Sequence, residues 1–287
     1  MTSAEEIKQL QQKANNIRIS LIEALIEAKS GHSGGPLGMA DIFSVLYFKE
    51  MKHDPKNPEW EERDRLVLSN GHICPVLYSA MAHAGYFPVE ELKTLRKFGS
   101  RLQGHPHREF LPYLETSSGP LGSGLSQAVG MALADRIDGK QNERIIWCLT
   151  SDGEHNEGNT WEAVLLAGKE KLNNLIQIID RNYIQIDGNT EEIMPLDPFV
   201  EKYRSFNWHV IEIDGNDVLD IIRGIKEARN VENKPVIIVA DTVPGKGVSF
   251  MENRYEWHGN PPGKGPEDVV SKDKQGEEAL KELEALI

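Results

Sequence analysis

The feature that most constrains the fold of this chain is a βαβ pattern near its middle. Residues 145–150 are apolar and β-branched, and they predict a buried strand that ends just before Asp152. Apolar residues recur every three or four positions over 158–172, which predicts a helix, and 175–180 predict the next buried strand. Such a crossover makes its two strands parallel, so Asp152 and Asn182 are expected at the carboxyl edge of the sheet, where open α/β sheets bind ligands.

Asp152 and Asn182 offer the chemistry that a hard cation needs. A carboxylate, an amide oxygen and a nearby backbone carbonyl would fill only some of the coordination positions of a cation. The remaining positions would be open to phosphate oxygens and water. Magnesium has this preference, with six oxygens at about 2.0–2.1 Å. The spacing from Asp152-Gly153 to Asn182 is similar to the signature of thiamine-diphosphate enzymes, although Ser151 stands where the first glycine is usual. The alternative remains that Asp152-Gly153 is an ordinary turn and Asn182 a cap.

The composition narrows the class of protein. The chain has 287 residues, of which 39% are hydrophobic and 27% charged, as in soluble globular proteins. A net charge of −13 argues against a nucleic-acid or anionic-membrane surface. The only cysteines, Cys74 and Cys148, predict two reduced thiols. The first thirty residues do not resemble a signal peptide and no apolar run is long enough to span a membrane, so we expect an unprocessed, cytoplasmic protein.

Histidines recur in loops that follow predicted helices and strands. Residues 4–29 carry one apolar stripe and predict a long helix. It ends at 31–38, where four glycines and a proline predict a loop without helix or strand. His32 lies in this loop, His72 follows a short strand, and His105 stands between a glycine and a proline. Glycines let backbone approach a ligand closely, so we favour a functional role for His32 over a surface one.

The rest of the chain continues the alternation of strands and helices. The small-residue run 117–124 leads into a helix over 125–137. Its glycines predict either a phosphate site at the helix N-terminus or close helix packing. Further strands are predicted at 209–213 and 236–241, followed by a loop over 255–259. The pattern predicts an α/β fold, a mostly parallel sheet with helices on both faces.

Over residues 10–262 the chain resembles a known family, the transketolases. The resemblance rests on six motifs in the family's order and approximate spacing: Gly31-His32, Asn70-Gly71-His72, Gly104-His105-Pro106, Gly119-Pro120-Leu121-Gly122, Asp152-Gly153 with Asn182, and Trp257-His258-Gly259. It implies the thiamine-diphosphate-binding fold, with residues 1–262 as the diphosphate-binding domain and 263–287 as a polar C-terminal tail with a short helix.

The resemblance also implies roles for individual residues. Asp152, Asn182 and the carbonyl of Ile184 would hold Mg²⁺ or Ca²⁺. Thiamine diphosphate would be contacted by His72, Gly119, Pro120, Leu121, Gly153, Asn182 and His258. The catalytic residues that line the sugar channel would be His32, His105 and His258, which can hydrogen-bond hydroxyls and move protons.

The implied reaction is transfer of a two-carbon ketol unit from a ketose phosphate to an aldose phosphate, as in the pentose phosphate pathway. The chain looks like the N-terminal subunit of a split transketolase. Its partner would be a C-terminal subunit with the pyrimidine-binding domain and the glutamate that activates the cofactor, in a heterotetramer with two copies of each chain. Helices over 121–134 and 158–172 are the expected contact. Glu157 and Glu162 match family glutamates near that contact, or simply favour a helix N-terminus.

Two alternatives stay open at this stage. One is a related half-enzyme, of the deoxyxylulose-phosphate type, that acts on another sugar. The other is a cofactor-binding module without turnover, against which the retained histidines count. Ser33 stands where the family usually has proline, and this departure bears on substrate specificity more than on cofactor binding.

Overall fold

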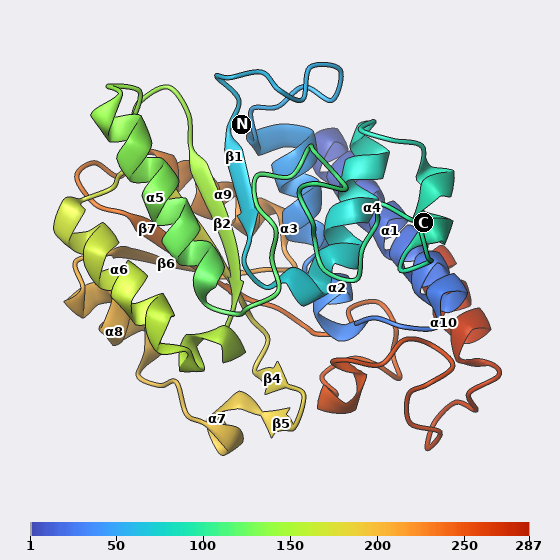
Figure 1. Cartoon of the computed structure of the whole chain (residues 1–287). Helices are drawn as coiled ribbons and strands as arrows, with labels where there is room; N and C mark the ends of the chain where they lie inside the picture. Colours follow the sequence, from blue (N-terminus) through green and yellow to red (C-terminus); the bar gives the residue numbers. More distant parts are fainter. Residues whose placement is uncertain (1, 287) are drawn as a thin grey trace.

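The computed structural model of the protein describes residues 2–286, which build one five-stranded sheet between two layers of helices (Figure 1). The strand order is β1-β2-β3-β7-β6, and every neighbouring pair is parallel. The strands are β1 (Arg65–Leu68), β2 (Ile146–Ser151), β3 (Leu175–Arg181), β6 (His209–Asp214) and β7 (Val236–Asp241). The predicted parallel α/β sheet is confirmed.

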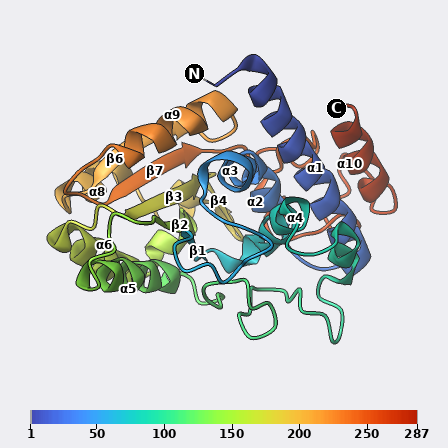
Figure 2. The same ribbon diagram turned by 90° about the horizontal axis from the view of Figure 1, so that it is seen from above.

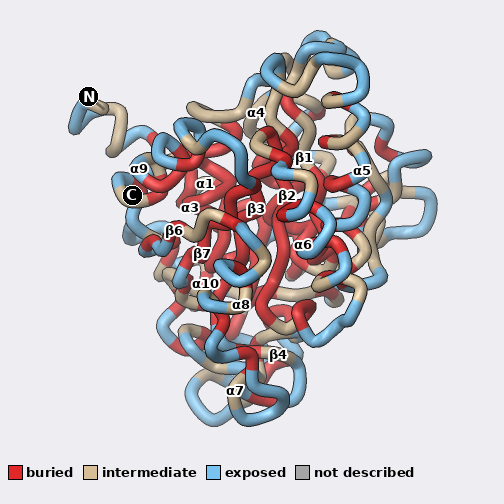
Figure 3. Tube along the Cα trace, turned by 90° about the vertical axis from the view of Figure 1, so that its left-hand side faces the viewer, coloured by how far each residue is buried: buried red, intermediate tan, exposed pale blue. Residues whose placement is uncertain are grey.

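The central strands are apolar because both of their faces are covered. Every residue of β2 and β3 is buried. Along β2, Trp147 and Leu149 enter one hydrophobic core, whereas Ile146 and Cys148 enter the other. This alternation explains why the strand has no polar face in the sequence. The buried centre and exposed outer loops are visible in Figure 3.

The helices form two layers, which Figure 2 shows on either side of the sheet. One layer contains α1 (Ala4–Ala28), α3 (Ala40–Val45), α4 (Cys74–Ala84) and α9 (Val218–Arg229). The other contains α5 (Ser123–Ile137), α6 (Gly158–Glu170) and α8 (Phe199–Ser205). The last helix, α10 (Gln275–Glu284), packs on α1 and buries Ala279 and Leu283. The division of the chain at residue 262 stays a prediction.

The prediction of an irregular loop over 31–38 is wrong in its second half. Residues Gly34–Gly38 form a short helix, α2. A side chain at Gly38 would place its Cβ 2.9 Å from the carbonyl oxygen of Val243, and one at Gly34 would lie 3.2 Å from that of Trp257. The glycines therefore allow a helical turn to pack against backbone from the far end of the chain, rather than preventing the turn.

Several smaller elements lie outside the five-stranded sheet. Helix α3 continues into a π-helical turn, Leu46–Glu50, and residues Val89–Thr94 form a 3₁₀ helix. A hairpin of β4 (Ile184–Gln185) and β5 (Gly188–Asn189) follows β3 and leads into α7 (Thr190–Ile193).

Within residues 2–286, no helix is both long and apolar enough to cross a membrane.

Candidate functional site

A cavity of about 420 Å³ opens where β2 and β3 end. Its walls come from segments far apart in the sequence: His32, His72, His105, Gly119, Leu121, Ser151, Asp152, Gly153, Glu154, Asn182, Ile184, Gln185, Ile186, Asp187 and His258. All site residues predicted from the sequence are in this set except Pro120, which is exposed beside Leu121. The fold therefore brings the six motifs together at one edge of the sheet, and their individual roles remain proposals.

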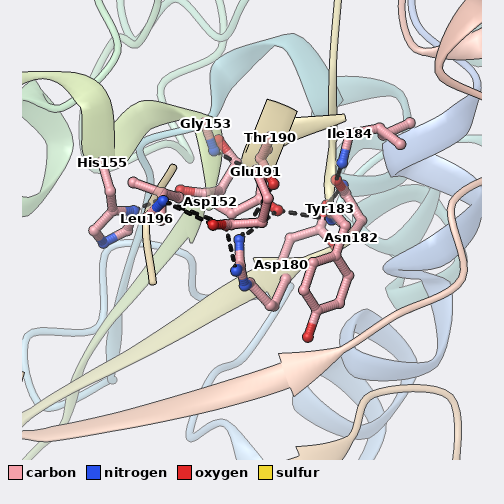
Figure 4. Close-up of polar contacts among 12 residues, drawn as sticks. Asp152, Gly153, His155, Asp180, Asn182, Tyr183, Ile184, Thr190, Glu191 and Leu196 are labelled. Carbon is pink, nitrogen blue, oxygen red and sulfur yellow. Dashed lines mark hydrogen bonds and ion pairs between the residues drawn. The ribbon is translucent and has the colours of Figure 1, made fainter. Parts of the chain in front are cut away.

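Asp152 lies at the floor of the cavity and is only 1% exposed. Figure 4 shows its carboxylate between the turns that follow β2 and β3. One oxygen accepts a hydrogen bond from the N–H of Gly153, and the other from the N–H of Tyr183, each at 2.7 Å. Burial raises the pKa of Asp152 to about 6, although the Arg181 guanidinium 3.5 Å away opposes the shift. Each oxygen retains a lone pair that could bind a cation.

Asn182 is oriented by a buried acid, Asp180. The Asn182 side-chain amide donates to Asp180 at 2.7 Å, and its oxygen accepts the N–H of Ile184 at 3.1 Å. Asp180 also accepts the hydroxyl of Thr242, from the loop after β7. Burial raises the pKa of Asp180 to about 7. Asp180 has no predicted role, and the signal that could have found it is an acidic residue at the end of a buried strand.

The hairpin that carries Ile184 is fixed by Arg181. This buried guanidinium pairs with Glu191 at 2.8 Å and Asp197 at 3.2 Å, and it lies 4.3 Å from the ring centroid of Tyr183. Tyr183 has φ +62°, in the left-handed region, which turns the chain sharply after β3. The turn delivers Ile184 to the cavity next to Asn182.

Three of the histidines that line the cavity stand close together. The ring centroids of His32 and His72 are 5.0 Å apart, and that of His258 lies 5.5 Å and 5.2 Å from the same two rings. Burial lowers the pKa of His32 to about 3 and that of His258 to about 4, and it lowers the pKa of His72 well below the usual value. The pKa of His105 is lowered too, by partial burial and by Arg96. These imidazoles are therefore neutral hydrogen-bonding groups near pH 7.

Ser33 joins two of the loops that carry these histidines. Its side chain is fully buried, and its hydroxyl donates to the carbonyl of Asn260 at 2.6 Å, with the carbonyl of Trp257 at 3.2 Å. The contact spans 227 positions of sequence and connects the turn of His32 to that of His258. The sequence marked Ser33 as a departure from the family, but only the fold shows what the hydroxyl binds.

In the run 117–124, amides at the start of α5 already have acceptors within the chain, which favours close packing over a phosphate site there. The N–H of Gly122 donates to Glu154 at 2.7 Å, and that of Gly124 donates to the Ser69 hydroxyl at 3.1 Å. The Ser123 N–H reaches the carbonyl of Pro120 at 3.4 Å. Glu154 was missed by the sequence analysis, although it is an acidic residue directly after the Asp152-Gly153 turn.

The cavity is suited to a polar ligand. Three buried nitrogen atoms of lining residues have no hydrogen-bond partner: Nδ1 of His32, Nδ1 of His258 and Nε2 of Gln185. Buried polar atoms nearly always have partners, so these atoms indicate groups that a ligand supplies. In residues 2–286 no three His, Cys, Asp or Glu side chains are placed to hold a metal. The oxygens of Asp152, Asn182 and Ile184 fit a hard cation only if a bound phosphate group completes its ligands.

A parallel sheet with a cavity at its carboxyl edge, lined by histidine and acidic side chains, is typical of the class of α/β ligand-binding proteins. Comparison with known proteins narrows the class. The family model described as "Transketolase, thiamine diphosphate binding domain" matches residues 9–282. The chain therefore belongs to the transketolase family and is its thiamine diphosphate-binding part, which confirms the resemblance, the fold and the transferase class.

Individual relatives are of two lengths. The chain is 44% identical to the 6-deoxy-6-sulfo-D-fructose transketolase subunit SqwG of Clostridium sp. (strain MSTE9), over 89% of this chain and 92% of that protein. It is 39% identical to an apulose-4-phosphate transketolase subunit of Phocaeicola vulgatus, over 88% and 89%. The transketolase structure from Leishmania mexicana superposes with a TM-score of 0.83 at 33% identity, covering 96% of this chain and 46% of that one. The chain thus spans less than half of the long transketolases that it matches.

Proposed function

We propose that this chain is the cofactor-binding subunit of a two-chain transketolase, which transfers a two-carbon ketol unit from a ketose phosphate to an aldose phosphate. The observation that carries the proposal is the meeting of six separated motifs in one cavity at the carboxyl edge of the sheet. Near-complete coverage of a relative named as a transketolase subunit supports it.

In the proposed holoprotein, Asp152, Asn182 and the carbonyl of Ile184 hold Mg²⁺ or Ca²⁺, and the phosphate oxygens of thiamine diphosphate complete the metal's ligands. Asp180 keeps the Asn182 oxygen turned toward the metal by binding the amide nitrogen. The cofactor is contacted by His72, Gly119, Pro120, Leu121, Gly153, Asn182 and His258. Pro120 is the weakest member of this set, because it lies outside the cavity lining.

The catalytic residues of the proposal are His32, His105 and His258. The cofactor, when bound, supplies the electron sink for breaking and forming the C–C bond. The three histidines orient sugar hydroxyls and carry protons to and from them, which neutral imidazoles can do because each ring offers one donor and one acceptor. The unpartnered Nδ1 atoms of His32 and His258 support this role.

The proposed partner is a C-terminal transketolase subunit with the pyrimidine-binding domain. Two relatives that this chain covers almost fully are named as subunits, which supports a two-chain enzyme. The heterotetramer with two copies of each chain, the cytoplasmic location and the place in the pentose phosphate pathway stay predictions.

A second candidate is the same transfer on a different sugar. It is favoured by the relatives, which are named for a sulfo-sugar and for apulose 4-phosphate. The cavity lining contains four histidines and three acids but no lysine or arginine. An anionic end of the substrate, phosphate or sulfonate, would therefore be recognised by the partner, and this chain alone does not distinguish the two.

The test is reconstitution. The chain is mixed with the product of an adjacent reading frame that encodes the pyrimidine-binding domain, together with thiamine diphosphate and Mg²⁺. Ketol transfer to an aldose phosphate is then measured from a ketose phosphate and from 6-deoxy-6-sulfo-D-fructose. Transfer should require both chains, and the preferred donor decides between the two candidates. Robust turnover by this chain without a second polypeptide would overturn the half-enzyme proposal.

A further inference from the structure

We propose that Glu154 is a positioning residue for the cofactor cavity, which fixes the loop Gly119–Gly122 to the end of β2. The inference rests on the proposed function, because it concerns how Gly119 and Leu121 are placed for the cofactor. Glu154 itself is assigned no contact with metal or substrate.

The side chain of Glu154 accepts hydrogen bonds from three separate segments. Glu154 follows Gly153 in a 3₁₀ turn and is fully buried. Oε2 accepts the N–H of Ser151 at 2.9 Å, at the end of β2. Oε1 accepts the N–H of Gly122 at 2.7 Å and also the hydroxyl of Ser69, which follows β1. One carboxylate therefore joins two strand ends to the loop before α5.

Helix α5 depends on this carboxylate because it has no side-chain cap of its own. Its N-cap residue is Gly122, with φ +81° and no side chain to accept a hydrogen bond. The first N–H groups of a helix need acceptors, and a negative charge there is favourable. Glu154 and Ser69 supply those acceptors to Gly122 and Gly124 from elsewhere in the chain. Glu154 thus acts as the helix cap that the local sequence lacks.

At Gly122 the loop packs closely against the start of α6, and its φ of +81° disfavours other residue types. A Cβ on Gly122 would lie 2.2 Å from Asn159 Oδ1 and 2.8 Å from Thr160 Oγ1, both at the start of α6. Thr160 in turn donates its hydroxyl to the backbone carbonyl of Glu154 at 3.1 Å. By contrast, Gly119 would have no atom within 4 Å of an added Cβ. Glu154 therefore holds the Gly122 end of the loop, while the other end is held at Ser118, whose N–H donates to the carbonyl of Pro106 at 3.0 Å.

This arrangement couples two walls of the cavity. Asp152 and Glu154 belong to one turn, while Gly119 and Leu121 lie on the loop that the same turn holds. If the Gly122 anchor is weakened, the loop loses its fixed distance to the turn of Asp152. Cofactor affinity should then fall, whereas the proton-transferring histidines on other loops are undisturbed.

The test compares Glu154→Gln with a control, Tyr203→Phe, in the full chain. The glutamine would keep one acceptor oxygen and turn an NH₂ group toward N–H donors, so it cannot satisfy both ends. Tyr203 is also fully buried, and its hydroxyl makes hydrogen bonds of 2.7 Å with His155 and 3.0 Å with Gln177. Amide hydrogen exchange of peptides covering 119–124 should become about tenfold faster or more in Glu154→Gln only.

Cofactor binding provides the second measurement. Calorimetric titration with thiamine diphosphate and Mg²⁺, in the complex with the partner chain, should show about a tenfold weaker affinity for Glu154→Gln. Steady-state kinetics at saturating cofactor should show little change in kcat.

Two results would overturn the inference. One is amide exchange and cofactor affinity that both equal those of the wild type, and the other is a loss of global stability without a local change in exchange. If Glu154→Gln does not fold, Ser69→Ala should speed exchange at Gly124, and unchanged exchange there would overturn the inference. Failure of the wild-type complex to bind cofactor would instead refute the proposed function.

Discussion

At the scale of single residues, Asp152 is held in place by the protein before any cation binds. Backbone N–H groups from two different turns fix its oxygens, and Arg181 lies beside it. A carboxylate fixed in this way needs little reorganisation to bind a metal, which is an advantage that a flexible surface aspartate lacks. The same hydrogen bonds explain why the carboxylate of Asp152 can be buried, since each of its oxygens has a donor.

Asp152→Ala should abolish the Mg²⁺ dependence of thiamine diphosphate binding, because only neutral ligands would remain. Asn182→Ala keeps the carboxylate and should weaken binding less, by about 10- to 100-fold. Calorimetric titration with and without Mg²⁺, on the chain with its partner, measures both effects. Asp187→Ala is the control, because Asp187 lines the same cavity but is exposed. Affinity that still increases with Mg²⁺ in Asp152→Ala would refute the metal assignment.

Alanine at His32, His105 or His258 should lower kcat by about 10² to 10⁴, the usual effect of losing a positioned proton-transfer group. His72→Ala should instead weaken cofactor binding. Steady-state kinetics of the reconstituted enzyme at saturating cofactor separate the two outcomes. His209→Ala is a suitable control, since His209 pairs with Glu227 on the surface. Wild-type kcat in the first three variants would contradict the sugar-channel assignment.

The buried histidines also predict acid sensitivity of the chain without ligands. Burial lowers the folded-state pKa of His258 to about 4, below its unfolded value near 6.5. The unfolded chain therefore binds the proton first, and stability is lost as pH falls from about 6.5 toward 4, by up to about 1.4 kcal/mol per pH unit. Urea unfolding across this range should show a shallower pH dependence for His258→Asn than for wild type. Comparing the two cancels the opposite titration of Asp180, and parallel curves would contradict the prediction.

A functional residue could be predicted from the sequence where the residues next to it in the chain form a recognisable pattern. Asp152, Asn182 and His72 follow strands directly, so the strand pattern alone placed them at one edge. Ser33 and Glu154 act through partners that are distant in sequence, such as Asn260 and Gly122. No local pattern identifies such partners, and only the assembled loops do.

At the scale of elements, the packing of α6 depends on one glycine. A Cβ on Gly168 would lie 1.8 Å from the carbonyl oxygen of Phe206, a backbone atom that cannot rotate away. Close contact at this point lets the helix approach the segment before β6. Hydrophobic periodicity predicted α6 because its apolar stripe is local, as it is for α1 and α9. It missed α2, because those glycines pack against loops more than 200 residues away.

Gly168→Ala should therefore destabilise the chain by about 3 kcal/mol or more, the upper range for overpacking. Gly130→Ala is the matched control, since Gly130 is an exposed residue of α5 with open space around an added Cβ. It should stabilise the chain by about 0.5–1 kcal/mol through helix propensity. Urea unfolding midpoints measure both changes. If both variants shifted the midpoint in the same direction, the predicted clash between an alanine at position 168 and the carbonyl of Phe206 would be contradicted.

At the scale of the whole molecule, the α5 and α6 layer leaves an apolar surface exposed. Leu165 and Leu166 on α6 are 55% and 42% exposed, and Ile137 at the end of α5 is 81% exposed. Glu157 is exposed just before the same helix. Exposed apolar side chains on neighbouring helices are typical of interaction sites. The surface lies on the helices that the sequence analysis expected at the subunit contact.

Leu165→Glu should prevent assembly with the partner while leaving the chain folded, because the side chain packs little in the isolated protein. Native mass spectrometry of the mixed chains should show the complex, with two copies of each, for wild type only. Leu219→Glu is the control, since Leu219 is 50% exposed on α9, which covers the other face of the sheet. An intact complex in Leu165→Glu would place the interface elsewhere.

The hydrogen bond between Ser33 and Asn260 has a consequence for how the protein is made. A ribosome adds about 5–20 residues per second, so the 227 positions between the two residues take roughly 10 to 50 seconds to synthesise. During that interval the turn of His32 emerges without the backbone on which it later rests, although β1, β2 and β3 can already pair. The nascent chain can thus pair β1, β2 and β3 before its cavity is complete, and cofactor capture has to await the synthesis of Asn260.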